Sequence, residues 1–503
     1  MNIQEAKEEL IRTVKAYTRK DEFDNYKIPD MRQRPIFLIG APGIGKTAIV
    51  EQAARECHVG LVAYTITHHT RQSAIGLPVI EKKTYRGETY TVTDYTMSEI
   101  VAAIYEKMEE SECEEGILFL DEINCVSETL APAMLQFLQY KSFGNHKIPS
   151  GWVIVAAGNP PEYNKAVREF DMATMDRMRK IEVEVNFEAW RSYAERNGVH
   201  GAILSYLDAK KDQFYRVENT ADGLRFVTAR GWEDLSEMIW SYEEIGETVT
   251  ENLIVQYLQR EETAHDFALY LALYYKYKKE YDVVKILRGT ADRQTYQKLA
   301  GAPFDERLSV VNHLLEALLA MLKGVVEQDE LVSVLYEVLK RLKEPVLAEK
   351  EKRAWEIVRA CHVERGRILE IKKKVDLVEE KEAKREERLI RILQNYEEGL
   401  QREQIQENED AFDWIREQFQ GEVDKRRRLA DGGLEALDHG FAFIEEMFGL
   451  SQEMVVFVTA ISKNYEAVRF ISEFGCEPFF LYHRELLFSE TRRELLEQIK
   501  KYT

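Results

Sequence analysis

The stretch Gly40-Ala41-Pro42-Gly43-Ile44-Gly45-Lys46-Thr47 follows an apolar run at residues 35–39 and precedes a helical pattern that begins at Ala48. This order of strand, glycine loop and helix lets backbone N–H groups wrap the phosphates of a nucleotide. Lys46 is then expected to bind the β- and γ-phosphates, and the Thr47 hydroxyl to bind Mg²⁺. The alternative is a glycine-rich turn that only joins strand to helix. Because every motif position is present in the right context, we predict that Gly40 through Ala48 bind a nucleoside triphosphate.

The composition predicts a folded cytoplasmic protein with several domains. The chain has 503 residues, of which 45% are hydrophobic, and a formal net charge of -20. Such an acidic surface repels nucleic acid, so nucleic acid is not an expected partner. The five cysteines are scattered, which is typical of reduced thiols in a reducing compartment. The charged first residues lack the apolar core of a signal peptide, and no apolar run has the length of a membrane span.

A second motif is the apolar run at residues 116–120 that ends in Asp121 and Glu122. A buried strand that ends in carboxylates at the edge of a sheet is where a nucleotide enzyme holds Mg²⁺ and the attacking water. We expect Asp121 to join the Mg²⁺ shell and Glu122 to act as general base. Taken alone, this run is also compatible with a strand that ends in a solvated acidic turn. The glycine loop upstream makes the catalytic interpretation the stronger one.

A third polar position, Asn159, follows the strand pattern of residues 152–157. Its amide could reach the γ-phosphate and orient water, although asparagine before proline is also a common turn former. A further run, residues 171–180, contains Arg177 and Arg179 and leads into another strand pattern.

These motifs, at residues 40–47, 120–124, 157–160 and 175–178, stand in the order and spacing of the AAA+ ATPases and most resemble the MoxR and dynein-related branch. The resemblance covers roughly residues 1–250. It implies that Asn159 is the first sensor of the γ-phosphate. It also implies that Arg177 is similar to the arginine finger, which reaches the nucleotide of a neighbouring subunit, with Arg179 as the competing candidate. The alternative is a surface arginine in a salt bridge.

The stretch at residues 226–235 resembles the second-sensor helix of the AAA+ lid, with Arg230 in its first turn. The family usually has a proline before this arginine, and Ala229 stands there instead. The alternative is an arginine at a helix start that pairs with Glu233 or Asp234.

The predicted fold is an α/β P-loop core with a parallel sheet flanked by helices, a helical lid and a largely helical C-terminal half. The core is expected over residues 1–186, with insertions near 84–92, which reads as a hairpin, and near 142–150. Four further parts are a lid (187–250), a helical domain (251–345), a segment of long charged helices (346–430) and a compact segment (431–503).

In the C-terminal half we expect separate helices at 305–323 and 331–342, and a new segment opening at Gly432-Gly433. Residues 341–430 hold 22 basic and 22 acidic residues, which is typical of long solvated helices or a helical hairpin. Their basic stretch at 425–428 could touch nucleic acid, but a solvated helix end is favoured. The pair His68-His69 could suggest a metal, although no carboxylate or cysteine lies near it in sequence, and a loop role is favoured.

The resemblance implies a Mg²⁺-dependent ATPase that converts ATP to ADP and phosphate and assembles as a ring, expected to be a hexamer. MoxR-type relatives act like chaperones on protein clients, often with proteins that carry von Willebrand factor A domains, so we expect such a client here. One alternative is a nucleic-acid motor or restriction-type NTPase on the same core. A metabolic kinase and a nucleotide-gated scaffold are two others.

Overall fold

A computed structural model describes residues 1–68, 71–111, 113–143, 146–163, 167–168, 170–220, 223–348, 353–374, 377–405 and 407–484. The chain divides into two compact units. Unit 1 comprises Met1–Trp190, Thr228–Arg230 and Arg367–Ala383. Unit 2 comprises Arg191–Val227, Gly231–Gly366 and Lys384–Thr503.

Unit 1 is built on a five-stranded parallel sheet with the strand order β2-β5-β8-β1-β9, which confirms the predicted α/β core. The strands are β1 (Ile36–Gly40), β2 (Gly60–Thr65), β5 (Gly116–Asp121), β8 (Trp152–Gly158) and β9 (Arg179–Val183). The central strands are continuous apolar runs, and all seven residues of β8 are buried. Such runs form inner parallel strands because helices cover both faces of the sheet.

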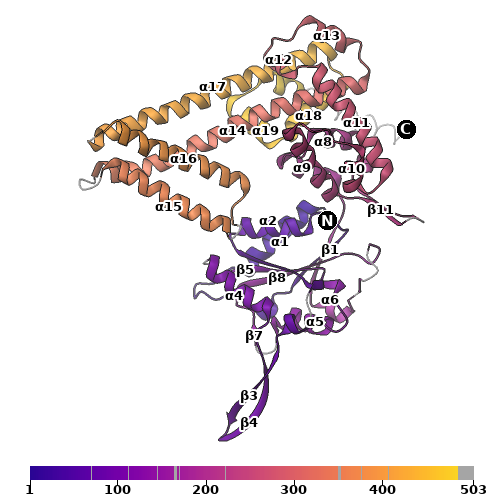
Figure 1. Cartoon of the computed structure of the whole chain (residues 1–503), viewed down its shortest axis with the longest axis vertical. Helices are drawn as coiled ribbons and strands as arrows, with labels where there is room; N and C mark the ends of the chain where they lie inside the picture. The colour runs from indigo at the N-terminus through magenta and orange to yellow at the C-terminus, as the bar shows by residue number, and fades with distance from the viewer. Residues whose placement is uncertain are drawn as a thin grey trace, which may run out of the picture. The chain divides into compact units, whose positions relative to one another are not determined.

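Helices lie on both faces of this sheet in Figure 1. On one face are α1 (Ile3–Tyr17) and α2 (Lys46–Cys57), and on the other are α4 (Glu99–Ser111), α5 (Ala131–Tyr140) and α6 (Met172–Asp176). The shorter elements of unit 1 are η1 (Asp30–Arg32), η2 (Ile66–His68), α3 (Arg71–Ile75), η3 (Ile123–Cys125) and the first residues of α7 (Phe187–Arg196). The parallel strands bring the carboxyl ends of β1, β5 and β8 to one edge of the sheet.

The predicted hairpin near residues 84–92 is confirmed and is longer than expected. β3 (Pro78–Tyr85) pairs with β4 (Glu88–Tyr95) over eight residues each, as an antiparallel ribbon. Its turn residues Arg86 and Gly87 both have positive φ, which matches the right-handed twist of the two strands. The ribbon projects away from the sheet in Figure 1.

A second small hairpin pairs β6 (Ser142–Phe143) with β7 (His146–Lys147). The ring of His146 donates from Nε2 to the backbone carbonyl of Tyr95 at 2.9 Å. This hydrogen bond ties the second insertion to the end of the ribbon.

Unit 2 begins with helices that share one aromatic core. Tyr206 on α8, Trp232 on α9 and Phe267 on α11 lie with their ring centroids 5.2 to 5.7 Å apart. The helices are α8 (Gly201–Ala209), α9 (Ala229–Ile245), α10 (Glu251–Leu258) and α11 (Glu261–Glu280). The expected lid therefore packs with a helix that lies beyond residue 250. β10 (Arg216–Thr220) and β11 (Gly223–Val227) form an antiparallel hairpin after η4 (Lys211–Gln213).

Two long antiparallel helices run through the rest of unit 2. They are α14 (Phe304–Ala348) and α17 (Asn408–Phe448). The expectation of two helices at 305–323 and 331–342 is wrong, since α14 is continuous and carries Pro345 near its end. The expected break at Gly432-Gly433 is also wrong. At Gly433 a Cβ atom would lie 3.0 Å from Phe470 Cζ, so glycine serves close packing inside the helix.

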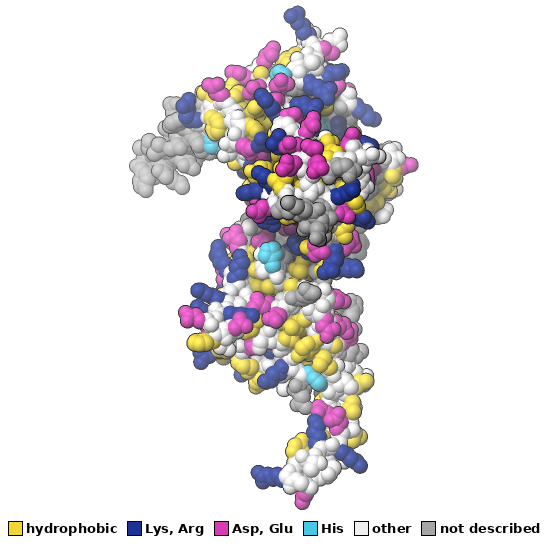
Figure 2. Space-filling view, turned by 90° about the vertical axis from the view of Figure 1, so that its left-hand side faces the viewer, with side chains coloured by type: hydrophobic (Ala, Val, Ile, Leu, Met, Phe, Trp, Pro, Cys, Tyr) yellow, Lys and Arg dark blue, Asp and Glu magenta, His cyan; other side chains and the backbone are white. Residues whose placement is uncertain are grey.

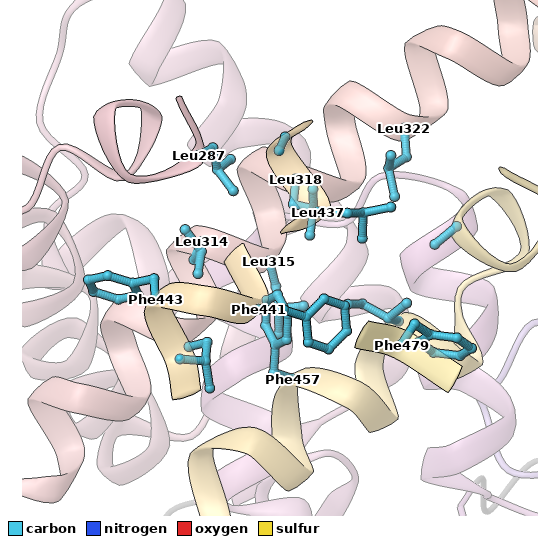
Figure 3. Close-up of a cluster of buried hydrophobic side chains, with 14 of the residues drawn as sticks. Leu287, Leu314, Leu315, Leu318, Leu322, Leu437, Phe441, Phe443, Phe457 and Phe479 are labelled. Atoms are coloured by element: carbon cyan, nitrogen blue, oxygen red, sulfur yellow. The ribbon is translucent and has the colours of Figure 1, made fainter. Parts of the chain in front are cut away.

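Besides this aromatic core, the described residues of α14 and α17 take part in two further apolar cores. The first, shown in Figure 3, forms where α14 and α17 meet shorter helices. These are α12 (Val283–Leu287), α13 (Arg293–Ala300), α18 (Gln452–Lys463) and α19 (Tyr465–Phe474). Leu318 of α14 and Phe441 of α17 lie near its centre. The second core lies farther along the same two helices, where α15 (Ala354–Lys374) and α16 (Glu380–Arg402) join them. The charged segment thus buries an apolar core, and its helices are not wholly solvated.

A charged layer separates the two cores. It consists of Gln328, Asp329 and Glu330 on α14 together with the side chains that bind them. Asp329 and Glu330 accept from arginines on three helices, at distances of up to 3.3 Å. These arginines are Arg385 on α16, Arg426 on α17 and Arg469 on α19. Arg426 belongs to the basic stretch at 425–428, and its pairing with Asp329 and Glu473 favours the structural interpretation of that stretch.

One helical stretch in the described part of the chain, Glu306–Leu347, is long and apolar enough to cross a membrane by length and composition. In its apolar window 56% is buried inside the protein, and Leu314 and Leu318 lie in the first core. Burial in a protein core accounts for this apolar character.

Candidate nucleotide-binding site

The loop after β1 has the open backbone geometry that phosphate binding requires. Gly43 and Gly45 have φ of 71° and 93°, in the left-handed region that favours glycine. A Cβ atom at Gly45 would meet nothing within 4 Å, so the loop is open there. Directly after it, α2 begins at Lys46 and presents its N–H groups. The loop therefore forms a cradle that offers backbone N–H groups and open space to a nucleotide phosphate.

Lys46 is the buried cation of this cradle, with 8% of its surface exposed. Its Nζ donates to the backbone carbonyls of Gly40 and Ala41 at 2.9 and 2.8 Å and to Asn159 Oδ1 at 2.9 Å. Burial lowers the pKa of Lys46 to about 8, against the opposing charge of Asp121. A phosphate beside this amine would restore a counter-charge, so the arrangement suits an anion.

Thr47 and Asp121 lie side by side at the edge of the sheet. The Thr47 hydroxyl donates to Asp121 Oδ2 at 3.2 Å, and the N–H of Glu122 donates to Asp121 Oδ1 at 2.8 Å. A hydroxyl and a carboxylate are the hard oxygen ligands that Mg²⁺ prefers, together with waters and phosphate oxygens. The two residues therefore fit Mg²⁺.

Glu122 stands in a strained backbone conformation. Its φ is 54°, which is uncommon for a residue other than glycine and is often found at functional sites. The Thr67 hydroxyl donates to Glu122 Oε2 at 3.1 Å and holds the carboxylate. Sequence reasoning missed Thr67. The available signal was its place just after β2, whose last residue, Thr65, pairs with Asp121.

Asn159 is positioned by a second residue that sequence reasoning missed, Asn124. The Asn124 amide donates from Nδ2 to the Asn159 carbonyl at 2.7 Å, and the Asn124 carbonyl accepts from the Arg168 N–H at 2.8 Å. A Cβ atom on Gly158 would clash with the Asn124 side chain. Glycine at position 158 thus lets Asn124 reach the end of β8 and fix Asn159 beside Lys46.

The two arginine candidates differ in their surroundings. Arg179 is held within its own chain, because its guanidinium donates to the Thr13 hydroxyl at 2.6 Å and pairs with Glu9 of α1. Arg177 is the C-cap residue that follows α6, and it is exposed. Within the described residues no hydrogen bond or ion pair joins the Arg177 side chain to Lys46, Asp121 or the other site residues.

Arg230 lies next to the phosphate loop. Its backbone N–H donates to the Gly43 carbonyl at 3.2 Å, in the first turn of α9. Its charge contributes to the lowered pKa of Lys46, after the larger effect of burial. The side chain is exposed. Thr228, just before α9, lies under the loop, since a Cβ atom on Gly43 would be 2.9 Å from Thr228 Cβ.

Among the described residues, no group of three or more His, Cys, Asp or Glu side chains could hold a metal ion. The metal site considered at His68-His69 is not tested by this result, because His69 and the side chain of His68 are not among the described residues.

A five-stranded parallel sheet of this order, with a phosphate loop after β1 and carboxylates after β5, matches the fold of a P-loop AAA+ core. Residues 35–178 match the family described as AAA domain (dynein-related subfamily). The matched segment contains the loop, Asp121, Glu122, Asn159 and Arg177, and it supports nucleotide binding by an ATPase of the AAA class. A search of curated proteins finds none that matches this chain.

Proposed function

We propose that this protein hydrolyses ATP with Mg²⁺ at the edge of its parallel sheet. The proposal rests on two side-chain hydrogen bonds between residues at or just after the ends of strands β1, β5 and β8. Lys46 bonds Asn159 at 2.9 Å, and Thr47 bonds Asp121 at 3.2 Å beside Glu122. These are the residue types that position a γ-phosphate and an attacking water.

In this mechanism each side chain has one task. The Lys46 ammonium and the loop N–H groups of residues 43–47 bind the phosphates. Thr47 and Asp121 would hold Mg²⁺, which supplies charge neutralisation at the phosphates when it is bound. Glu122 accepts the proton of the attacking water, and Asn159 orients that water by its amide.

The test of hydrolysis is Glu122→Gln, which keeps the size of the side chain and removes the base. We expect ATP affinity to stay within about threefold of wild type while phosphate release falls at least about a hundredfold. Unchanged phosphate release in Glu122→Gln would contradict the assignment.

We further propose that copies of the chain assemble as a ring, of hexameric size, in which Arg177 completes the site of a neighbour. Its exposed side chain supports this, whereas Arg179 is engaged with α1. A guanidinium delivered to the γ-phosphate stabilises the charge of the transition state.

A mixing experiment tests delivery in trans. Arg177→Ala lacks the finger but keeps its own loop, while Lys46→Ala lacks the loop cation but keeps the finger. Each variant alone should be inactive, and mixed assemblies should recover ATP hydrolysis. Arg179→Ala in place of Arg177→Ala is the matched control, and it should stay active on its own. Failure to recover activity in mixtures that do co-assemble would rule out delivery by a neighbour.

We propose that the work of the ring is chaperone-like remodelling of a protein client, as the MoxR resemblance implies, in the cytoplasm. The ribbon of β3 and β4 supports a protein contact, since Ile80 is 75% exposed and Tyr85 is 53% exposed. In Figure 2 the ribbon projects at the bottom, with apolar side chains among charged ones of both signs. Such a mixed surface suits a protein better than a phosphate backbone.

A client can be captured with the Glu122→Gln form in the presence of ATP. Because this form should bind ATP without hydrolysing it, the assembled ring should stay bound to its client. A protein with a von Willebrand factor A domain is the first candidate. The matched control is the same form with Ile80→Ser and Tyr85→Ser. This control should still bind ATP but should no longer capture the client. Equal capture by both forms would show that the ribbon is not the surface that binds the client.

A further inference from the structure

The ribbon of β3 and β4 has no apolar core of its own. None of the residues of its two strands is buried. Two paired strands alone are marginally stable in water, and a third strand or a packed helix stabilises such a structure. The ribbon therefore gains stability from a strand that adds to one of its two outer edges.

The turn of the ribbon determines which backbone groups point outward. Arg86 and Gly87 both have positive φ and form a two-residue turn, which closes on the hydrogen-bonded pair Tyr85 and Glu88. Hydrogen-bonded and non-hydrogen-bonded pairs alternate along an antiparallel ladder, and residues of the second kind direct their backbone polar groups away from the partner strand. These outward residues are Pro78, Ile80, Lys82 and Thr84 on β3 and Thr89, Thr91, Thr93 and Tyr95 on β4.

The outer edge of β3 is protected against an added strand. Pro78 has no N–H to offer, and Lys82 places a charge in the middle of the edge. Proline and lysine are residues by which natural proteins block strand addition at an edge. An added strand is therefore disfavoured on this side of the ribbon.

The outer edge of β4 is open by comparison. Its outward residues Thr89, Thr91 and Thr93 are exposed, uncharged and β-branched, and β-branched residues favour strands. Among the residues that the structure describes, none hydrogen-bonds the outward backbone groups of these three threonines. From Thr89 to Thr93 the edge is about 14 Å long, which a segment of about five extended residues would match.

The base of the same edge already binds a group from outside the ribbon. The outward carbonyl of Tyr95 accepts from His146 Nε2 at 2.9 Å, and the Tyr95 N–H donates to Asp94 Oδ1 at 2.9 Å. The backbone groups of Tyr95 are thus satisfied, and the open part of the edge begins at Thr93.

We propose that an extended segment of a protein client adds to β4 as a third strand. Its backbone exchanges hydrogen bonds with Thr89, Thr91 and Thr93. Its side chains lie beside these threonines on one face and beside Tyr90 and Val92 on the other, which favours β-branched and aromatic residues in the client. This inference rests on the proposed client contact of the ribbon and names the chemistry of that client.

A second copy of this chain fits the edge less well. Antiparallel pairing of two β4 strands through all three threonines places Thr91 opposite its own copy and Glu88 opposite Asp94. Like charges directly opposite each other are destabilising. A client segment without acidic residues at the matching positions avoids this repulsion.

The experiment compares proline substitutions at two threonines that lie opposite each other in the register, Thr89 and Thr84. Thr89→Pro removes an outward N–H from β4 and places a ring in the path of an added strand. Thr84→Pro makes the same change on β3 and is the matched control. Neither N–H is used inside the ribbon, so both variants should keep it, since proline is tolerated where the N–H of an edge strand faces solvent.

The probe is a fluorescein-labelled octapeptide of alternating valine and threonine with a lysine at each end. Its binding to the full chain without nucleotide is measured by fluorescence anisotropy. We expect Thr89→Pro to weaken binding by at least about tenfold and Thr84→Pro by less than about twofold. Equal losses in the two variants, or an unchanged affinity in Thr89→Pro, would overturn the inference.

A second probe tests whether the peptide binds through its backbone. The same octapeptide with N-methyl groups on every valine and threonine keeps its side chains and charges but has no amide N–H to donate to β4. It should not bind measurably, and equal binding of the two peptides would overturn the inference. So would sedimentation in which the nucleotide-free wild type and Thr84→Pro self-associate while Thr89→Pro does not, because a second copy would then occupy the edge.

These measurements need neither ATP nor a captured client. If the Glu122→Gln form captures no client while peptide binding depends on Thr89 as expected, the proposed remodelling is contradicted and this inference is upheld. A captured client together with a peptide that binds Thr89→Pro as well as wild type has the opposite meaning.

A second pair of variants covers the case in which Thr89→Pro disturbs the nearby turn. Thr91→Pro changes the middle of the β4 edge, and Lys82→Pro lies opposite it on β3. We expect the same contrast in peptide affinity between these two variants. Losses of equal size would again overturn the inference.

Discussion

Raising the pH from 7 to 9 should weaken ATP binding by about tenfold, because Lys46 loses its proton in the free protein. The pKa of Lys46 is lowered to about 8 by burial in the loop. The amine donates to the carbonyls of Gly40 and Ala41 and to Asn159, and none of these groups carries a full negative charge. Phosphates would supply that charge, so the bound form keeps its proton to a higher pH.

The size of the effect follows from this difference. Below pH 8 the amine is charged both before and after binding, and affinity is nearly constant. Above pH 8 the free protein has lost the proton, so ATP binding must take one up. Each further pH unit then costs about 1.4 kcal/mol, or about tenfold in affinity, until the pKa of the bound form is reached.

Isothermal titration calorimetry at pH 7, 8 and 9, in two buffers of different ionisation enthalpy, measures both the affinity and the number of protons taken up. The control is Lys46→Arg, which stays charged throughout this range and should show little of the decline. A flat affinity between pH 7 and 9 in the wild type would refute the reasoning. A decline of equal slope in Lys46→Arg would assign the proton to another group.

Four substitutions test other parts of the structure. Gly43→Ala and Gly45→Ala should both strain a left-handed backbone, by about 1–2 kcal/mol. Only the first places a Cβ atom against Thr228, so calorimetry of the nucleotide-free protein should show the larger fall in Tm for Gly43→Ala. Asn124→Ala removes the 2.7 Å hydrogen bond to the Asn159 carbonyl and should lower kcat by about three- to tenfold in steady-state assays, with KM changed less. Phe441→Ala should lower the free energy of unfolding of the first core by about 3–5 kcal/mol in urea titrations, because its ring is 1% exposed.

The nucleotide site could be predicted from sequence wherever its signal is local. The loop glycines and the carboxylates after β5 each follow an apolar strand run, and each pattern is contained in a few consecutive residues. Thr67 and Asn124 could not be found in this way, because their roles depend on which strands are neighbours. Once the order β2-β5-β8 is known, polar residues just after β2 and β5 become candidates.

The helical half was harder to predict because helix length depends on packing at a distance. Pro345 and Gly433 are local signals for a break, and both stand inside continuous helices. Pro345 has no N–H to donate to the Arg341 carbonyl, so α14 lacks one backbone hydrogen bond there, yet the helix continues to Ala348. Gly433 is retained because Phe470 and Leu322 fill the space beside it, a contact made by residues far apart in the chain.

The charged layer at Gln328, Asp329 and Glu330 has a consequence for how the helical half comes apart. Taking ion pairs out of water is costly, so the layer bonds the two apolar cores to each other less firmly than continuous apolar packing would. We therefore predict that residues of α14 on either side of the layer unfold as two separate cooperative blocks. Amide hydrogen exchange should show these two blocks. Backbone amides near Leu318 should be more strongly protected than those near Leu335, and the protection should change abruptly at the charged layer. The second block would then unfold while the first stays folded, so that a partly unfolded form of unit 2 is reached more easily than the fully unfolded chain.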